Sequence, residues 1–485
     1  MLESLPNTIE QLHAHLSAGE LTVKEALTWQ QQRLQDQSLG NRAVVEYLDL
    51  NGEPNQTTNS SELQPLSGVG LAHKDIFNLS GRAPGLGLGL SQPAPTLQMA
   101  PALACLHQNG AHHLASLHMA ALAFGATSSN ADLGPCTNPL NPQAIVGGSS
   151  SGSAVAVAQG WVYGSLGTDT AGSVRIPAAS CGLVGLKTSH ALVSTQGCAP
   201  LAPALDTVGV LARSFGDARS VLLGALPQAR TRQLLAQTQR VGLKSARIRA
   251  FLPSELDADV SSCLLAFIET MNTFQVEDAV DPFQALSQSA EILMLSQIAQ
   301  THAQVLELKP EPFNVPQRYP TNLPKALAES VLAGLAMPSF WAEQVTRARA
   351  QALEDFLKQA FEAADFVILP ALATPLPLLE EVEPGWPLFD VKKLLGLHRY
   401  MGFVNYLGLP AVVAPVGVDR RGLPICAQVL ARPDQDVALL DWAEQHWSHA
   451  LSWSSHAAGA APSSRLSRPL GEPLVNPTHS VSLHA

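Results

Sequence analysis

Two glycine- and serine-rich stretches carry the groups of this chain that could perform nucleophilic chemistry. The first spans 147–153 (GGSSSGS) and the second spans 167–177 (GTDTAGSVRIP). A serine hydroxyl can attack a carbonyl carbon when another group takes its proton. Glycine lets backbone N–H groups approach a ligand closely. The two stretches therefore favour a serine nucleophile beside an oxyanion hole.

A lysine is the candidate for the group that takes the proton. Lys74 ends the apolar segment 70–74 (GLAHK). Burial at the end of a strand disfavours the charged amine and lowers its pKa, which is what a lysine base for a serine requires. The alternative interpretation is an ordinary salt bridge between Lys74 and Asp75.

Metal and phosphate chemistry have little support in the sequence. The 15 histidines include no H-E-x-x-H motif and no set at ligand spacing, so we expect them on the surface or in satisfied core positions and expect no metal. No Gly-Lys-[Ser/Thr] phosphate loop follows the glycine-rich stretches, and no cofactor is expected.

The segment 148–152 (GSSSG) also matches the G-x-S-x-G pattern, which would make Ser150 the nucleophile of an α/β-hydrolase. That turn needs a strand immediately before it, whereas 138–142 (NPLNP) precedes this one closely. Low-complexity Gly/Ser runs match the pattern easily, so it is the weaker interpretation.

Lys74 and the two serine-rich stretches resemble the amidase signature family, whose members hydrolyse carboxylic amides with a Ser–cis-Ser–Lys triad. The resemblance extends from about residue 5 to about residue 450 and is dense from 68 to 217. Its motifs are Lys74-Asp75, 147–153, 167–187, 200–202, 205–209, 405–411 and 422–424.

By this resemblance the nucleophile is Ser173, the bridging serine is Ser149 and the base is Lys74. Ser173 follows Ser149 by 24 residues, and Ser149 follows Lys74 by 75, which agrees with the family's spacing. In the family the peptide bond before the bridging serine is cis, and the lysine draws a proton through that serine from the nucleophile. The resemblance also implies an oxyanion hole made by the backbone N–H groups of Thr170, Ala171, Gly172 and Ser173.

Three positions depart from the family pattern. Ala121 stands where many members carry a glutamate, 84–89 (PGLGLG) replaces a Thr-x-Gly-Ser pattern, and Ala171 replaces a glycine. None removes a triad group, but the first two leave the pocket shape and the substrate class open. Asp169 and Arg175 are expected to support the loop that carries Ser173.

Composition restricts the partners and the compartment. The 29 Lys and Arg against 40 Asp and Glu give a net charge of −11 with no basic stripe, so no nucleic acid partner is expected. The six scattered cysteines form no C-x-x-C pair and are expected to be reduced. We expect no signal peptide, no membrane association and a cytoplasmic location, with a homodimer as the candidate assembly.

The predicted fold class is α/β, a single large α/β/α domain with a mixed central sheet covered by helices. The sequence divides into N-terminal helices (1–66), the catalytic core (67–217), a mainly helical substrate-pocket region (218–345), the C-terminal part of the core (346–453) and a flexible tail (454–485). Pairs with capping-box spacing, Asn7 with Glu10 and Thr22 with Glu25, predict two helices within 7–36. Further helices are predicted over 101–109, 341–364 and 435–450, and strands over 44–50, 365–369, 411–418 and 425–431.

We therefore predict an amidohydrolase that cleaves a small carboxylic amide through an acyl-enzyme on Ser173. The apolar bias of 284–340 favours an apolar or aryl acyl group. Two alternatives remain, a ureide hydrolase acting on biuret- or allophanate-like substrates and the A-type subunit of a tRNA-dependent amidotransferase. A non-enzymatic binding protein is disfavoured by the intact Lys74, Ser149 and Ser173.

Overall fold

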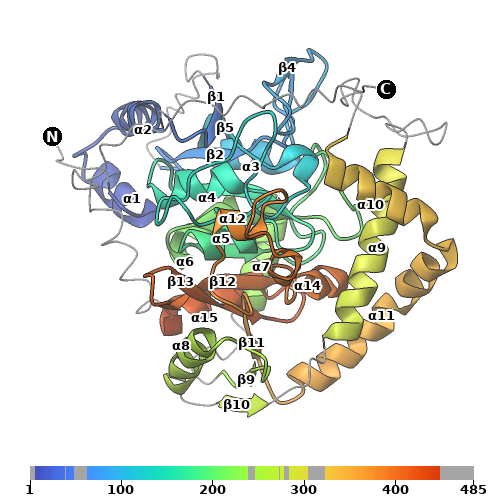
Figure 1. Cartoon of the computed structure of the whole chain (residues 1–485). Coiled ribbons are helices and arrows are strands. Elements are labelled where there is room, and N and C mark those ends of the chain that lie inside the picture. The colour runs from blue at the N-terminus through green and yellow to red at the C-terminus, as the bar shows by residue number, and fades with distance from the viewer. Residues whose placement is uncertain are drawn as a thin grey trace, which may run out of the picture.

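A mixed eight-stranded sheet forms the centre of the computed structural model (Figure 1), which describes residues 6–38, 40–48, 63–238, 246–271, 274–277, 283–303 and 323–447. Its strands are β6 (Gly164–Asp169), β7 (Val184–Lys187), β8 (Thr207–Ala212), β9 (Ile248–Phe251), β10 (Phe274–Glu277), β11 (Phe366–Pro370), β12 (Ala411–Val418) and β13 (Pro424–Leu430). The order is β10-β9-β11-β13-β12-β7-β8-β6. The pairs β10/β9 and β9/β11 are parallel and the others antiparallel, which confirms the predicted α/β class with a mixed sheet.

Strand alternation sends side chains to both faces of this sheet, and helices cover both. Phe366 of β11 stacks on Trp442 with ring centroids 4.8 Å apart. The next residue, Val367, joins a buried cluster with Phe403 on the opposite face. The first face carries α6 (Phe215–Gly224), α8 (Ala258–Glu269) and α15 (Asp436–Trp447), and the second carries α4 (Ser151–Ala158), α5 (Arg175–Ser180) and α14 (Gly402–Leu407).

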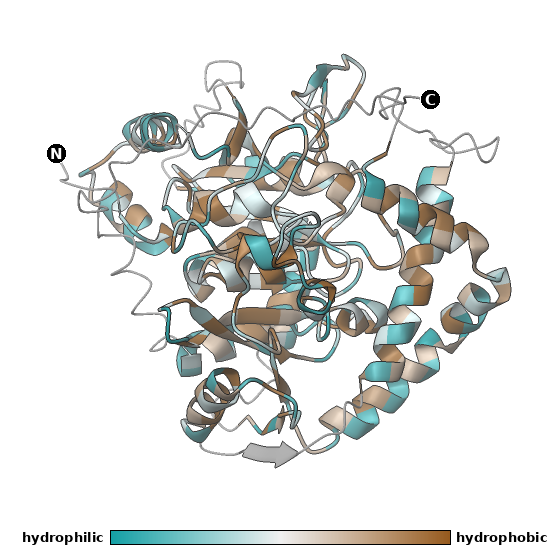
Figure 2. Ribbon diagram, viewed as in Figure 1, coloured by the Kyte–Doolittle hydropathy of each residue, from teal (hydrophilic) through white to brown (hydrophobic). Residues whose placement is uncertain are grey.

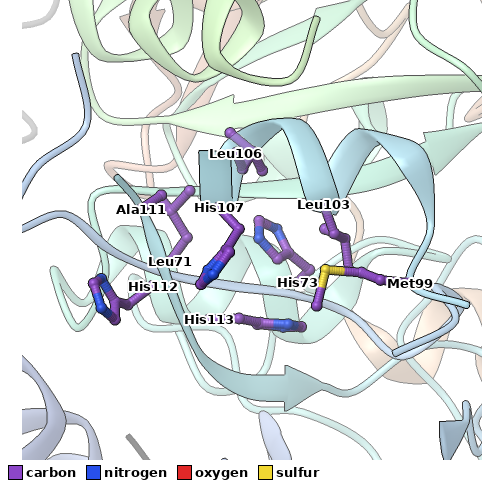
Figure 3. A pocket seen from close by; sticks show the side chains of 9 residues that line it. All are labelled: Leu71, His73, Met99, Leu103, Leu106, His107, Ala111, His112 and His113. Atoms are coloured by element: carbon purple, nitrogen blue, oxygen red, sulfur yellow. The ribbon is translucent and has the colours of Figure 1, made fainter. Parts of the chain in front are cut away.

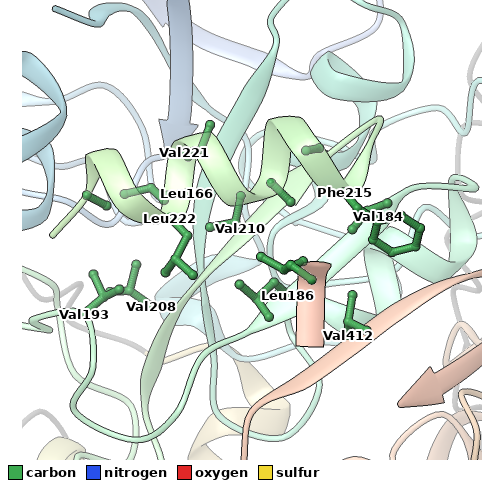
Figure 4. Packing of buried hydrophobic residues seen from close by; sticks show 14 of the residues in the cluster. Leu166, Val184, Leu186, Val193, Val208, Val210, Phe215, Val221, Leu222 and Val412 are labelled. Carbon is green, nitrogen blue, oxygen red and sulfur yellow. The ribbon is translucent and has the colours of Figure 1, made fainter. Parts of the chain in front are cut away.

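The core of the first face lies between β6, β7, β8 and α6 (Figure 4). Its side chains are almost entirely removed from solvent, and they include Leu166, Val184, Leu186, Val208, Val210, Phe215, Val221 and Leu222. Burying a side chain of this size stabilises a fold by about 1.5–3 kcal/mol. Figure 2 shows the same concentration of apolar residues along the central strands. This packing makes β6 a rigid support for the loop that follows it.

A second, three-stranded sheet of order β1-β5-β2 lies beside β6. Its strands are β1 (Val44–Tyr47), β5 (His112–Leu117) and β2 (Gly70–Lys74), with β2 and β5 parallel. The N–H of Leu166 in β6 donates to His73 Nδ1 in β2 at 2.9 Å. This contact brings the end of β2, and with it Lys74, next to the end of β6.

The N-terminal helices are α1 (Ile9–Ser17) and α2 (Val23–Gln37). Thr22 and Glu25 form the predicted capping box of α2. The capping box predicted for Asn7 with Glu10 is wrong, because α1 begins one residue later and its cap is Thr8, whose side chain accepts from the N–H of Gln11. Asn7 and Thr8 are both good capping residues, so the sequence alone does not separate them.

The other predicted elements lie within a few residues of their expected bounds. The strands over 365–369, 411–418 and 425–431 are β11, β12 and β13, and the helix over 435–450 is α15. The remaining elements are β3 (Arg82–Ala83), β4 (Gln92–Pro93), α3 (Pro101–Gln108), a 3₁₀ turn (Ala121–Ala123), α7 (Gln228–Thr238), α9 (Gln284–His302), α10 (Lys325–Ala336), α11 (Ser339–Phe361), α12 (Leu379–Val382) and α13 (Val391–Gly396). Helices α9, α10 and α11 lie together along one side of the molecule (Figure 1), and the tail over 454–485 lies outside the described residues.

Candidate active site

Lys74 ends β2 inside the protein, with 1 % of its surface exposed. Its Nζ donates to Ser149 Oγ at 2.7 Å and to Thr168 Oγ1 at 2.8 Å. The alternative salt bridge to Asp75 does not form, and the Asp75 carboxylate accepts the N–H of Gly85. The amine therefore faces two hydroxyls.

Burial lowers the pKa of Lys74 to about 7, because removal from water disfavours the charged amine. The carboxylates of Asp206 and Asp169 and the thiol of Cys198 act in the opposite direction, but burial outweighs them. A lysine with this pKa is uncharged in a large fraction of molecules at neutral pH and can accept a proton.

Ser149 lies in the turn before α4, and the peptide bond between Gly148 and Ser149 is cis, as the resemblance implies. Glycine is required at 148, since a Cβ there would lie 2.4 Å from the carbonyl oxygen of Gly125. The N–H of Ser150 donates to the carbonyl oxygen of Ser173 at 3.2 Å. The serine turn is thereby joined to the loop that carries Ser173.

Ser173 lies between β6 and α5 and is the most open of the three predicted catalytic groups, with 9 % of its surface exposed against 0 % for Ser149. A nucleophile must reach its substrate, so this difference fits the assignment of Ser173 rather than Ser149. Ser150 is also fully buried, and the residues before it form no strand, so the structure argues against the α/β-hydrolase interpretation.

A buried ion pair shapes the loop around Ser173. The Asp169 carboxylate accepts the N–H groups of Gly172 and Val174 at 2.9 and 3.1 Å. Arg175 donates to both of its oxygens. Burial alone would raise the pKa of Asp169, but the Arg175 guanidinium holds that pKa well below its usual range. These contacts are the loop support expected for Asp169 and Arg175.

One of the four predicted oxyanion donors is already committed. The N–H of Gly172 donates to Asp169, so Gly172 does not have the free donor that the sequence analysis gave it. Within the described residues, no backbone or side-chain acceptor takes the N–H groups of Thr170, Ala171 or Ser173.

Sequence reasoning gave no role to several residues that complete the site. Thr168 is the second partner of Lys74, and strand alternation before Ser173 could have indicated it. Asp206 accepts the Thr170 hydroxyl at 2.6 Å and the N–H groups of Leu201 and Ala202. Asn405 donates to the carbonyl oxygen of Asp169 at 2.8 Å. Asn405 lies 236 residues from Asp169 in the chain, so no local pattern in the sequence indicates this contact.

A desolvated amine hydrogen-bonded to a buried serine hydroxyl, beside the loop that carries Ser173, is an arrangement found in hydrolases that act on amide C–N bonds. The family model Amidase matches residues 49–440, so the chain belongs to this family. Amidase 1 of Oryza sativa subsp. japonica is 31 % identical over 439 residues, which cover 81 % of this chain and 94 % of that protein.

Two further comparisons agree with this assignment. The A-type subunit of glutamyl-tRNA(Gln) amidotransferase from Geobacter metallireducens is 28 % identical over 494 residues, which cover 94 % of this chain and 100 % of that protein. A crystal structure of an amidase superposes with a TM-score of 0.74 at 26 % identity, covering 90 % of this chain and 99 % of the other.

The described part of the chain contains no helix with both the length and the apolar character needed to cross a membrane.

Proposed function

We propose that this enzyme hydrolyses a small carboxylic amide through an acyl-enzyme on Ser173, with Ser149 and Lys74 relaying the proton. One observation carries the proposal, the 2.7 Å contact between Lys74 Nζ and Ser149 Oγ. It lies in surroundings that lower the pKa of Lys74 to about 7. An amine with this pKa is uncharged in many molecules near neutral pH, so it can accept a proton, and it is still basic enough to hold that proton.

We infer the reaction from this arrangement together with the triad that the family resemblance implies. Neutral Lys74 takes the proton of Ser149 as Ser149 takes that of Ser173, and Ser173 Oγ bonds to the amide carbon. The C–N bond then breaks, and the proton returns through Ser149 to the leaving nitrogen. Water enters, gives a proton to the same relay and releases the carboxylic acid from Ser173, which recovers its hydrogen.

The negative charge that develops on the carbonyl oxygen needs hydrogen-bond donors. We assign this role to the N–H groups of Thr170, Ala171 and Ser173, which have no acceptor among the described residues. Removing one such donor typically lowers a rate by about 10²–10³-fold.

The compartment and the partners belong to the same proposal. All six cysteines are unpaired, which is typical of a reducing compartment and supports the cytoplasm. The homodimer and the absence of a nucleic acid partner stay predictions, as does the ureide substrate. The near full-length similarity to the A-type subunit of an amidotransferase supports a second candidate, a protein that works only together with a partner chain.

The test is mass spectrometry with a fluorophosphonate probe, run beside a panel of aliphatic and aryl amides. The probe should label Ser173, and Ser173→Ala should lower hydrolysis by more than about 10³-fold. Ser150→Ala is the matched control, because Ser150 is fully buried and its hydroxyl has no partner among the described residues. Labelling of Ser150 would overturn the assignment, and activity only with an added partner chain would favour the amidotransferase candidate.

A further inference from the structure

A histidine far along the chain contacts the loop that carries Ser173. His398 lies between α13 and α14, and its Nδ1 is 2.7 Å from the carbonyl oxygen of Ala171. A carbonyl oxygen only accepts, so Nδ1 carries the hydrogen and donates it. This contact fixes the tautomer of the ring.

The contact acts on one particular peptide group. The peptide between Ala171 and Gly172 is held at its carbonyl by His398, and at its N–H by Asp169 at 2.9 Å. A peptide group is planar, so holding both ends sets the orientation of the whole unit. Gly172 has φ of 115°, which other residues rarely adopt, and this is the point where the chain turns toward Ser173.

The segment that carries His398 is itself firmly held. Gln428 Nε2 donates to the carbonyl oxygen of Tyr400 at 2.8 Å, and Arg175 donates to that of Met401 at 3.2 Å. The Met401 side chain packs on Gly172, where an added Cβ would lie 2.9 Å from its Cγ. These contacts fix the backbone next to His398, so its ring can hold the loop in one position.

We propose that His398 is a positioning residue that orients the oxyanion hole by holding the Ala171 carbonyl. The N–H groups of Ala171 and Ser173 belong to the peptides on either side of the held one, so their directions follow from it. This inference rests on the proposed role of Ser173. His398 itself touches no reacting atom and supplies no proton.

The surroundings of the ring favour a neutral donor. Burial lowers the pKa of His398, and the Arg175 guanidinium acts in the same direction. The hydrogen bond to Ala171 and the charges of Asp169 and Glu291 act against this shift. Nδ1 keeps its hydrogen in both charge states, so the contact persists when the ring is protonated.

The experiment compares three variants. An asparagine amide nitrogen occupies nearly the position of Nδ1, whereas the longer glutamine side chain carries its nitrogen near Nε2. His398→Ala and His398→Gln should lower kcat by roughly 10- to 100-fold with KM within about two-fold, since a misplacement of 1 Å costs on the order of 10² in rate. His398→Asn should recover most of the loss. Affinity for a boronic acid that adds to Ser173 should fall with kcat.

His446→Ala is the matched control. His446 is also half-buried, and its Nδ1 is 2.8 Å from a carbonyl oxygen, that of Trp442 in α15. This variant should keep both kcat and boronic acid affinity. An unchanged kcat in all three His398 variants, or an equal loss in all three, would overturn the inference even when the proteins fold with native melting temperatures. Failure of the probe to label Ser173 in the unsubstituted enzyme would instead overturn the proposed function.

Discussion

Two lysines of this protein are buried alike, but their hydrogen-bond partners differ. Burial lowers the pKa of Lys187 to about 7, as it does for Lys74. Lys187 donates to the carbonyl oxygens of Thr188 and Leu409, at 2.6 and 2.8 Å. Carbonyls cannot supply a proton, whereas the hydroxyls beside Lys74 can both donate and accept. Of the two lysines, Lys74 is therefore the one whose partners could give it a hydrogen.

This difference predicts the pH profile of the enzyme. Hydrolysis should rise with pH through about 7 as Lys74 loses its proton, since the pKa of that amine is about 7. Lys74→Met should remove this rise of the rate with pH, and it should lower kcat/KM by roughly 10²–10⁴-fold, the usual contribution of a general base. Initial rates over a pH series that brackets the pKa of Lys74 measure both effects.

Lys187→Met is the control for this experiment, because the carbonyl partners of Lys187 have no proton to give. In this variant the rise of the rate with pH should stay at the same pH, even if the protein becomes less stable. The assignment of the base would be contradicted if the rate still rose with pH in the Lys74 variant, or if the rise moved to another pH in the Lys187 variant.

At the scale of elements, several histidines line a small cavity between β2, β5 and α3 (Figure 3). The rings of His73 and His113 have centroids 4.6 Å apart. His73 Nδ1 accepts the N–H of Leu166, and His113 Nε2 lies 3.0 Å from the carbonyl oxygen of Ala115. Burial lowers the pKa of His113 to about 4 and lowers that of His73 as well. Both rings are therefore neutral at neutral pH, directly beside the strand end that carries Lys74.

These histidines should make the fold sensitive to acid. An unfolded histidine binds a proton near pH 6.5, while His113 does so near 4 in the folded protein. Between those values the unfolded state holds more protons, so the free energy of unfolding falls as the pH falls from about 6.5 to 4. The loss for this one ring is at most about 3 kcal/mol.

The variant His113→Gln removes the titration and keeps an amide donor for Ala115. Urea unfolding at neutral pH and again in mild acid, just above the pKa of His113, should show a smaller difference in stability for this variant than for the unsubstituted protein. The matched change His15→Gln, at a histidine on α1 that contacts Glu20, tests a site apart from this cavity. Equal pH dependence in the His113 variant and the unsubstituted protein would count against this source of acid sensitivity.

The elements themselves were largely predictable, for local reasons. The capping box at Thr22 and the apolar runs of β11 and β12 are local patterns, and each corresponds to an observed element. The motif-rich stretch 68–217 likewise supplied Lys74, Ser149 and Ser173 as candidates. Contacts made by a single side chain across the fold leave no periodic pattern. That is why the sequence did not indicate the contact of His398 with Ala171, 227 residues away. Gly172 is a different case: the family resemblance implied a free N–H there, whereas Asp169, three residues earlier, accepts that N–H.

At the scale of the whole molecule, one buried guanidinium joins the segments that build the site. Arg175 of α5 donates to Asp169 at the end of β6, to Gln428 of β13 at 2.7 Å and to Asn405 of α14 at 2.6 Å. These partners lie as far as 253 residues away from Arg175 in the chain. The serine loop and the C-terminal half of the sheet are thus held by one fully buried side chain.

Removing this side chain should destabilise the protein as a whole. Arg175→Met leaves the Asp169 carboxylate buried without its cation and leaves Gln428 and Asn405 without their donor. Breaking a buried pair from one side costs about 3–5 kcal/mol. Arg347→Met is the control, because Arg347 pairs with Glu343 on α11 at 3.2 Å while 82 % of its side chain is exposed. An exposed pair contributes at most about 1 kcal/mol. Urea unfolding at neutral pH measures both, and similar losses in the two variants would mean that Arg175 does not hold the halves of the site together.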